Sequence, residues 1–116
     1  MSISFARYAA SSPGARAQSI PDAVDLLDMG DNPNDISLVI IDDNAGSLEL
    51  LSAALENEGI RIFTAQDPEE GVEIVFREHP QIVLTDLVMP GLSGLDVLDR
   101  VVAFDPAIDV VLMTAH

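Results

Sequence analysis

The sequence contains no cysteine, no lysine and no tryptophan among its 116 residues. Without cysteine the chain cannot form a disulfide or offer a thiolate to a metal ion, and this composition is compatible with the reducing cytoplasm, the location we expect. The longest purely aliphatic runs, such as "LVII", are about four residues, whereas a membrane-spanning helix needs roughly 20 apolar residues. The sequence therefore predicts no transmembrane segment.

Basic residues are scarce as well. Five arginines stand against 20 acidic residues, which gives a net charge of −15. Because so little positive charge is available to neutralise phosphates, the composition argues against direct binding to nucleic acid or to an anionic membrane. It favours cations and basic protein surfaces as partners.

The charge is unevenly distributed along the chain. Residues 1–21 hold two arginines and no acid, and all 20 acidic residues follow them. This Ser- and Ala-rich segment could be read as an organellar transit peptide, although a disordered tail is the simpler interpretation. We predict an extension over residues 1–35 that is largely disordered, with a short helix at 20–30 between Ser19 as cap and Gly30 as stop.

From Ile36 onward, short apolar runs rich in β-branched residues alternate with amphipathic segments. The runs at 36–41, 60–65, 81–85 and 108–114 are typical of strands buried on both faces. Helices are predicted between them, after Asn44, after the cap Asp67 and from Ser93. This order predicts an α/β domain with a parallel sheet and right-handed crossovers.

Each predicted helix has an apolar stripe that should face the sheet. The expected inward residues are Leu48, Leu51 and Leu55 in the first helix, Val72, Val75 and Phe76 in the second, and Leu95, Leu98 and Val102 in the third.

Polar side chains follow three of the predicted strands. Asp42 and Asp43 stand at the end of the first, Asp86 at the end of the third, and Thr114 is the last residue of the fourth. Ligands of an open parallel sheet bind outside the carboxyl ends of its strands, so we expect these groups to lie together. Two like charges 4 Å apart repel by roughly 4 kcal/mol at an effective dielectric near 20, so a proton or a cation should lie among them. Oxygen ligands of this kind suit Mg2+.

The motifs "LVIIDDN", "IVLTDLVMPGLSGLDVL" and "VVLMTAH" resemble the receiver domain of bacterial response regulators. The resemblance covers residues 36–116, and its most specific part is an Asp followed by a variable pair, Met-Pro-Gly and a second Gly. It implies a flavodoxin-like (CheY-like), doubly wound parallel sheet with strand order 2-1-3-4. The form "PAIDVVLMTAH" looks most like receivers attached to ATPase-type transcription activators.

The resemblance also implies a role for each site residue. Asp86 matches the aspartate that accepts a phosphoryl group from a histidine kinase or phosphotransfer protein, and Thr114 matches the hydroxyl that responds to it. Ala115 matches the small residue beside that hydroxyl. The implied Mg2+ ligands are Asp42, Asp43, Asp86 and the backbone carbonyl of Val88.

The sequence departs from the family pattern after its fourth strand. A complete receiver has a fifth strand and two further helices, and it carries a phosphate-pairing lysine and an aromatic switch residue that have no counterpart here. Without that lysine, Asp86 is expected to accept phosphate less readily. The fourth strand should also become an exposed edge that favours a homodimer. The sequence could be a fragment of a longer regulator, a truncation completed by dimerisation or swapping, or a fold completed by its own N-terminal extension.

Two other classes of function, an interaction module and an enzyme, compete with a phospho-accepting receiver. A degenerate receiver could act only as an interaction or dimerisation module. An aspartate-nucleophile phosphatase would need an Asp-x-Asp pattern, but Val88 stands where the second acid belongs. A Ser-His-Asp hydrolase would need a well-placed catalytic histidine. The two histidines of the sequence are His79, beside a helix-ending proline, and His116, the last residue, and neither position suits that role. We therefore expect no turnover enzyme.

Overall fold

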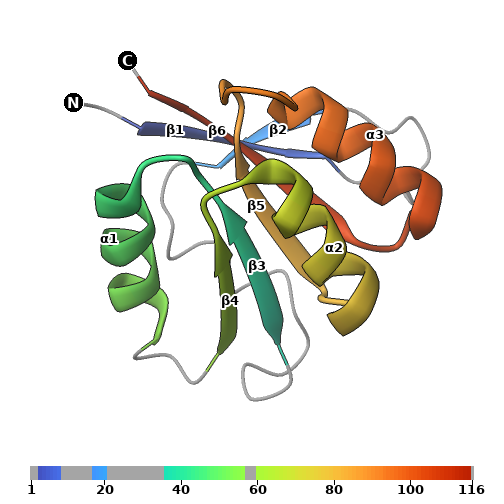
Figure 1. Ribbon diagram of the computed structural model, residues 1–116, viewed down its shortest axis with the longest axis horizontal. Coiled ribbons are helices and arrows are strands. Elements are labelled where there is room, and N and C mark those ends of the chain that lie inside the picture. Colours follow the sequence, from blue (N-terminus) through green and yellow to red (C-terminus); the bar gives the residue numbers. More distant parts are fainter. Residues whose placement is uncertain (1–2, 9–16, 21–35, 57–59, 116) are drawn as a thin grey trace.

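A six-stranded sheet organises the computed structural model, which describes residues 3–8, 17–20, 36–56 and 60–115 (Figure 1). The strands follow one another across the sheet in the order β2-β1-β6-β5-β3-β4. The elements are β1 (Ile3–Tyr8), β2 (Ala17–Ile20), β3 (Ser37–Ile41), α1 (Ala45–Glu56), β4 (Arg61–Ala65), α2 (Pro68–Glu78), β5 (Ile82–Asp86), α3 (Gly94–Phe104) and β6 (Asp109–Ala115).

The four strands from β3 to β6 that were predicted from the sequence form the parallel part of the sheet. β3 pairs with both β4 and β5, and β5 pairs with β6, all in parallel. In order of appearance among these four strands, the arrangement is 2-1-3-4, as the resemblance implies. Every residue of β3 is buried, because helices cover both faces of a sheet built by βαβ crossovers.

Two apolar clusters fill the two faces of the sheet. Alternate strand residues such as Val39, Val83 and Val110 pack with α2 and α3 on one face. Their neighbours, such as Leu38, Leu84 and Val111, belong with α1 to the other cluster. In Figure 1, α2 and α3 lie side by side and α1 stands apart from them. The period-two alternation of strand side chains produces this division.

The predicted stripe of α1 is confirmed, because Leu48, Leu51 and Leu55 are all buried. In α2 the prediction is right for Val72 and Val75 but wrong for Phe76, which is 43% exposed. The ring of Phe76 instead packs on Phe104 of α3, with centroids 4.8 Å apart. The two aromatic side chains cover the outer seam between the helices.

The stripe of α3 is also displaced from its predicted position. Leu98 is buried as predicted, whereas Leu95 is 53% exposed and Val102 is only partly buried. Val97 and Val101 lie fully buried in place of the other two. Residues four positions apart lie on the same face of a helix, so Val97 and Val101 face the sheet together.

The helix starts follow their capping residues. The amide of Ser47 donates to the Asn44 side chain over 3.1 Å, as a cap of α1 should. Ser93 and Asp96 form a reciprocal capping box at the start of α3. Asp67 precedes α2, but its side chain makes no capping hydrogen bond. None of the helices in the described ranges is both long and apolar enough to cross a bilayer.

The edge of β6 is occupied by a strand that the sequence did not predict. β1 runs antiparallel to β6 from Ile3 opposite Ala115 to Tyr8 opposite Val110, and β2 pairs with the outer side of β1. The expectation of an exposed β6 edge for homodimer contact is therefore wrong. An unpaired apolar edge exposes backbone groups, and here a strand of the same chain satisfies them. Apart from Ile20 in β2, the helix predicted at 20–30 lies outside the described residues, and the division at residue 35 stays a prediction.

We expect Ser93→Ala to lower the free energy of unfolding by about 1 kcal/mol, the usual loss when an N-cap acceptor is removed. The Ser93 hydroxyl accepts the Asp96 amide at 3.2 Å, and alanine leaves that amide without its cap. Urea unfolding measures the change. Ser93→Thr keeps the acceptor and should stay within about 0.5 kcal/mol of the parent; equal losses in both variants would show that the cap is not the cause.

Candidate functional site

Three carboxylates meet at the carboxyl edge of the parallel strands. Asp42 follows β3, Asp43 is its neighbour and Asp86 ends β5. The register pairs Ile41 with Thr85, so the next residue on each strand, Asp42 and Asp86, falls at the same level of the sheet. One oxygen from each of the three acids lies within 4.8 Å of the others. The sequence-based prediction that these three residues converge is confirmed.

Asp42 is the buried member of the group, with 5% of its surface exposed. One of its carboxylate oxygens accepts the backbone N–H of Asn44 at 2.9 Å. Burial raises the pKa of Asp42 above its ordinary value, and the charges of Asp86 and Asp43 raise it further, against the lowering effect of the Asn44 hydrogen bond. Keeping Asp42 charged therefore costs free energy, and a bound cation would lower that cost.

Asp86 is half-buried and Asp43 is exposed, so the group opens to solvent on one side. The Asp86 carboxylate accepts the backbone N–H of Val88 through a long 3.3 Å contact. The buried hydroxyl of Thr85 donates to the Asp86 carbonyl oxygen at 3.1 Å. These contacts fix the backbone of Asp86 and leave its carboxylate accessible from the solvent side of the group.

The loop after Asp86 is tied to its surroundings at both ends. The Leu87 N–H donates to Met113 of β6 at 3.0 Å, and the Gly94 N–H donates to the Leu87 carbonyl at 2.9 Å. Gly91 turns the chain with φ of +86°, a conformation that glycine adopts without strain. The side chain of Val88 points to solvent, and Met89 is buried. The Val88 carbonyl as a metal ligand stays a prediction.

Gly94 supports the site in a way that the motif alone did not explain. A Cβ on Gly94 would lie 2.5 Å from the Asp86 carbonyl oxygen and 2.8 Å from the Leu87 Cα. The start of α3 thus rests directly on the backbone that carries Asp86. The sequence showed this glycine as part of the motif, but its contact could be found only from the packing of the helix on the loop.

Thr114 stands at the same edge of the sheet as the carboxylates. Asp86 pairs with Met113, so Thr114 is the next residue along β6, and its side chain is half-buried. Ala115 follows it as the last residue of β6. Both occupy the end of the sheet predicted for them, and their roles stay predictions.

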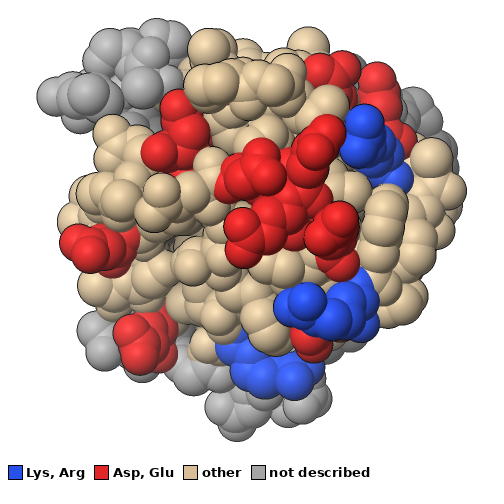
Figure 2. All heavy atoms as spheres, viewed as in Figure 1, with Lys and Arg blue, Asp and Glu red and all other residues tan. Residues whose placement is uncertain are grey.

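The donor set of this edge fits Mg2+. It consists of carboxylate oxygens on two neighbouring strands and contains no imidazole or thiolate, the set preferred by a hard cation. Figure 2 shows acidic side chains gathered on the face that carries α2 and α3, with basic side chains near its margin. That field favours the approach of cations.

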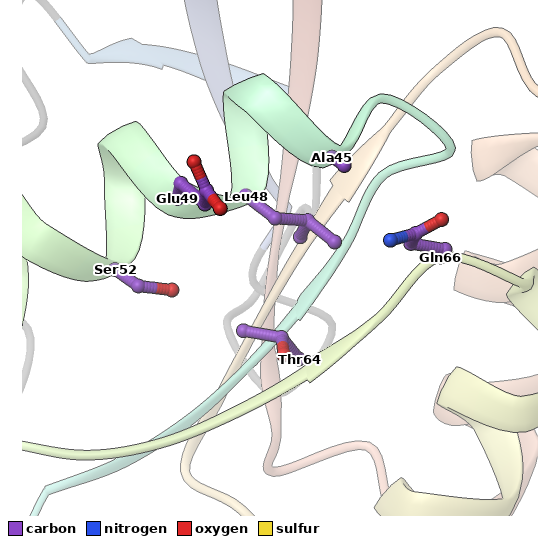
Figure 3. A pocket seen from close by; sticks show the side chains of 6 residues that line it. All are labelled: Ala45, Leu48, Glu49, Ser52, Thr64 and Gln66. Atoms are coloured by element: carbon purple, nitrogen blue, oxygen red, sulfur yellow. The ribbon is translucent and has the colours of Figure 1, made fainter.

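A shallow cavity of about 230 Å³ lies between α1 and β4, separate from the carboxylate group. Figure 3 shows Glu49 and Ser52 on α1, with Thr64 and Gln66 on the opposite side and Leu48 between them. No residue of the predicted site lines it.

Comparison with known proteins agrees with this geometry. The family model of the response regulator receiver domain matches residues 38–116. The chain is 35% identical over 79 residues to sporulation initiation phosphotransferase F of Bacillus subtilis, which covers 68% of this chain and 64% of that protein. It is 33% identical over 79 residues to the transcriptional regulatory protein GlrR of Escherichia coli, covering 68% of this chain and 18% of that protein.

Solved structures give the same result. A response regulator receiver domain protein from Clostridium thermocellum superposes with a TM-score of 0.59 at 32% identity, covering 61% of this chain and 58% of the other. A response regulator receiver protein from Pseudomonas putida gives 0.56 at 30% identity, covering 62% and 60%. The chain thus spans less than two thirds of these relatives.

We expect Gly94→Ala to destabilise the fold by about 1–3 kcal/mol, the usual cost of forcing extra atoms into a packed contact. The clash is with backbone, which cannot rotate away as a side chain does. Chemical denaturation measures the loss. Gly91→Asn is the matched control, because asparagine tolerates positive φ and nothing lies within 4 Å of that Cβ position. A smaller loss for Gly94→Ala than for the control would contradict the close approach.

We expect Asp42→Asn to raise the Tm of the metal-free protein at neutral pH by about 2–5 °C, the shift that a fraction of a kcal/mol gives in a domain of this size. The variant removes a buried charge that its neighbours repel. Since the folded-state pKa is raised, the wild type loses stability as pH rises through that pKa, and the gain should vanish as pH falls to the ordinary value of 3.8. Asp99→Asn, on the exposed side of α3, should show neither effect.

Proposed function

The chain belongs to the response regulator receiver domain family, and on that premise we propose that it is a phospho-accepting signalling module whose acceptor is Asp86. The observation that carries the proposal is the meeting of three carboxylates at the end of two adjacent parallel strands. Of the three, Asp42 is buried, Asp86 is half-buried and Asp43 is exposed.

The proposed reaction transfers a phosphoryl group from a phosphohistidine of the partner to Asp86. A carboxylate oxygen of Asp86 attacks phosphorus, the phosphorus–nitrogen bond breaks, and the imidazole nitrogen of the partner keeps the electron pair. Mg2+ held by Asp42, Asp43, Asp86 and the Val88 carbonyl would neutralise charge on the transferring group. The Val88 amide and the Thr85 hydroxyl hold Asp86 in position.

The accepted group would be read out through β6. A phosphoryl group adds about −1.5 to −2 charges and new acceptor oxygens, which a nearby hydroxyl can bind. Thr114 lies one residue beyond the register partner of Asp86 and is our candidate for that hydroxyl. Ala115 beside it would leave room for the group.

The proposed partners follow from the same chemistry. The donor would be a sensor histidine kinase or a phosphotransfer protein, acting in the cytoplasm. The output would be a further domain or protein, and the relatives of this chain include the transcriptional regulatory protein GlrR. With a net charge of −15 the chain itself is poorly suited to contact DNA, so regulation of transcription would act through that output.

A second candidate is an interaction module that accepts no phosphate. The meeting of the three carboxylates is compatible with it, because carboxylates can bind Mg2+ whether or not Asp86 is modified. Such a module would bind Mg2+ at the same acids and remain unmodified.

Incubation with Mg2+ and phosphoramidate, a small phosphorus–nitrogen donor, should add one acid-stable, base-labile phosphoryl group to the chain. Intact-mass spectrometry measures the product. Asp86→Asn should abolish it, because the amide is not a nucleophile, and Asp99→Asn should leave the yield unchanged. Mg2+ binding without any phosphoryl product would favour the interaction module, and modification that survives in Asp86→Asn would refute Asp86 as the acceptor.

A further inference from the structure

The N-terminal hairpin of β1 and β2 contacts the end of the sheet where the site lies. β1 is antiparallel to β6, so the beginning of β1 lies beside the end of β6. Ser4 is the register partner of Thr114, and Ile3 is that of Ala115. The opposite end of β1, at Arg7 and Tyr8, lies beside Val111 and Val110, away from the carboxylates.

One strand therefore joins the hairpin to the site. On one side of β6, Met113 pairs with Asp86, and its carbonyl accepts the Leu87 N–H at 3.0 Å. On the other side, Met113 pairs with Phe5 of β1. The backbone at Met113 is shared by the two pairings, so a displacement of Asp86 and Leu87 reaches β1 through a single strand.

The physical basis for coupling is the repulsion at the carboxylate group. With no cation, three like charges lie within 4.8 Å and push the ends of β3 and β5 apart. A divalent cation replaces that repulsion by attraction and fixes the position of Asp86. The backbone pairing of β6 with Asp86 on one side, and with β1 on the other, should then break open less often.

We propose that the N-terminal hairpin is a docked regulatory element whose attachment to β6 is linked to occupancy of the carboxylate site. Cation binding strengthens the docking of β1, and by reciprocity a docked β1 strengthens cation binding. The inference goes beyond phosphate acceptance and rests only on the part of the proposed function in which the three acids bind Mg2+.

Hydrogen exchange of the whole chain, followed by mass spectrometry with and without Mg2+, tests the first half of this linkage. Exchange in the segment 3–8 should slow by about threefold or more at saturating Mg2+. Tyr8 gives an independent readout, because it is the only tyrosine and the sequence has no tryptophan. Its fluorescence should change along the same titration curve.

Ala6→Pro tests the reciprocal half. Proline removes a backbone N–H from a strand that has a neighbour on each side, so it weakens the hairpin without touching the acids. Calorimetric titration should then show Mg2+ affinity reduced by about fivefold, within the usual range of coupling between sites. Ala6→Ser keeps the N–H and is the matched control, with affinity close to that of the parent.

The outcomes separate this inference from the proposed function. If Mg2+ fails to bind the wild type, the metal-dependent function and the linkage both fall. If Mg2+ binds but exchange and fluorescence of β1 stay unchanged, only the linkage falls. A folded Ala6→Pro variant with wild-type affinity also overturns it. If that variant does not fold, the exchange measurement on the wild type decides the question.

Discussion

The mutual repulsion of Asp42, Asp43 and Asp86 is the constraint around which this structure is arranged. Parallel pairing of β3 with β5 brings the acids to one edge, where an oxygen from each lies within 4.8 Å of the others. Burial makes the charge on Asp42 harder to hold, and the Asn44 amide offsets part of that cost. A proton or a cation at that edge would relieve the repulsion, and this connects the sheet to the chemistry proposed for it.

The supports of Asp86 act on its backbone more than on its carboxylate. Thr85 donates to its carbonyl, Gly94 allows α3 to press against the same peptide, and Leu87 is tied to β6. The carboxylate accepts a long contact from the Val88 N–H and also interacts with the Asp42 side chain. A side chain whose backbone is fixed in this way can be positioned accurately, which suits the acceptor role that we propose for Asp86.

The same edge extends to the N-terminal hairpin. β6 is paired on one side with β5 and on the other with β1, so the strand that carries Thr114 has a neighbour on each side. The pairing satisfies backbone groups that would otherwise be open to another chain. It also places the start of β1 beside the end of β6 (Figure 1), with Ile3 opposite Ala115 at the end of the sheet where the acids lie.

The sequence by itself determined the four parallel strands, their order through the family motifs, and the acids at their ends, because strand periodicity and the Asp-x-x-Met-Pro-Gly pattern are local signals. The sequence also identified the buried face of α1, but only the tertiary structure decided the faces of α2 and α3: Phe76 and Leu95 turn outward because Val75, Val97 and Val101 meet the sheet. It also revealed the contact of Gly94 with Asp86 and the pairing of β1 with β6. The Gly94 contact depends on how α3 packs on the loop after Asp86, and the pairing of β1 with β6 joins residues more than 100 positions apart, which leaves no local pattern to read.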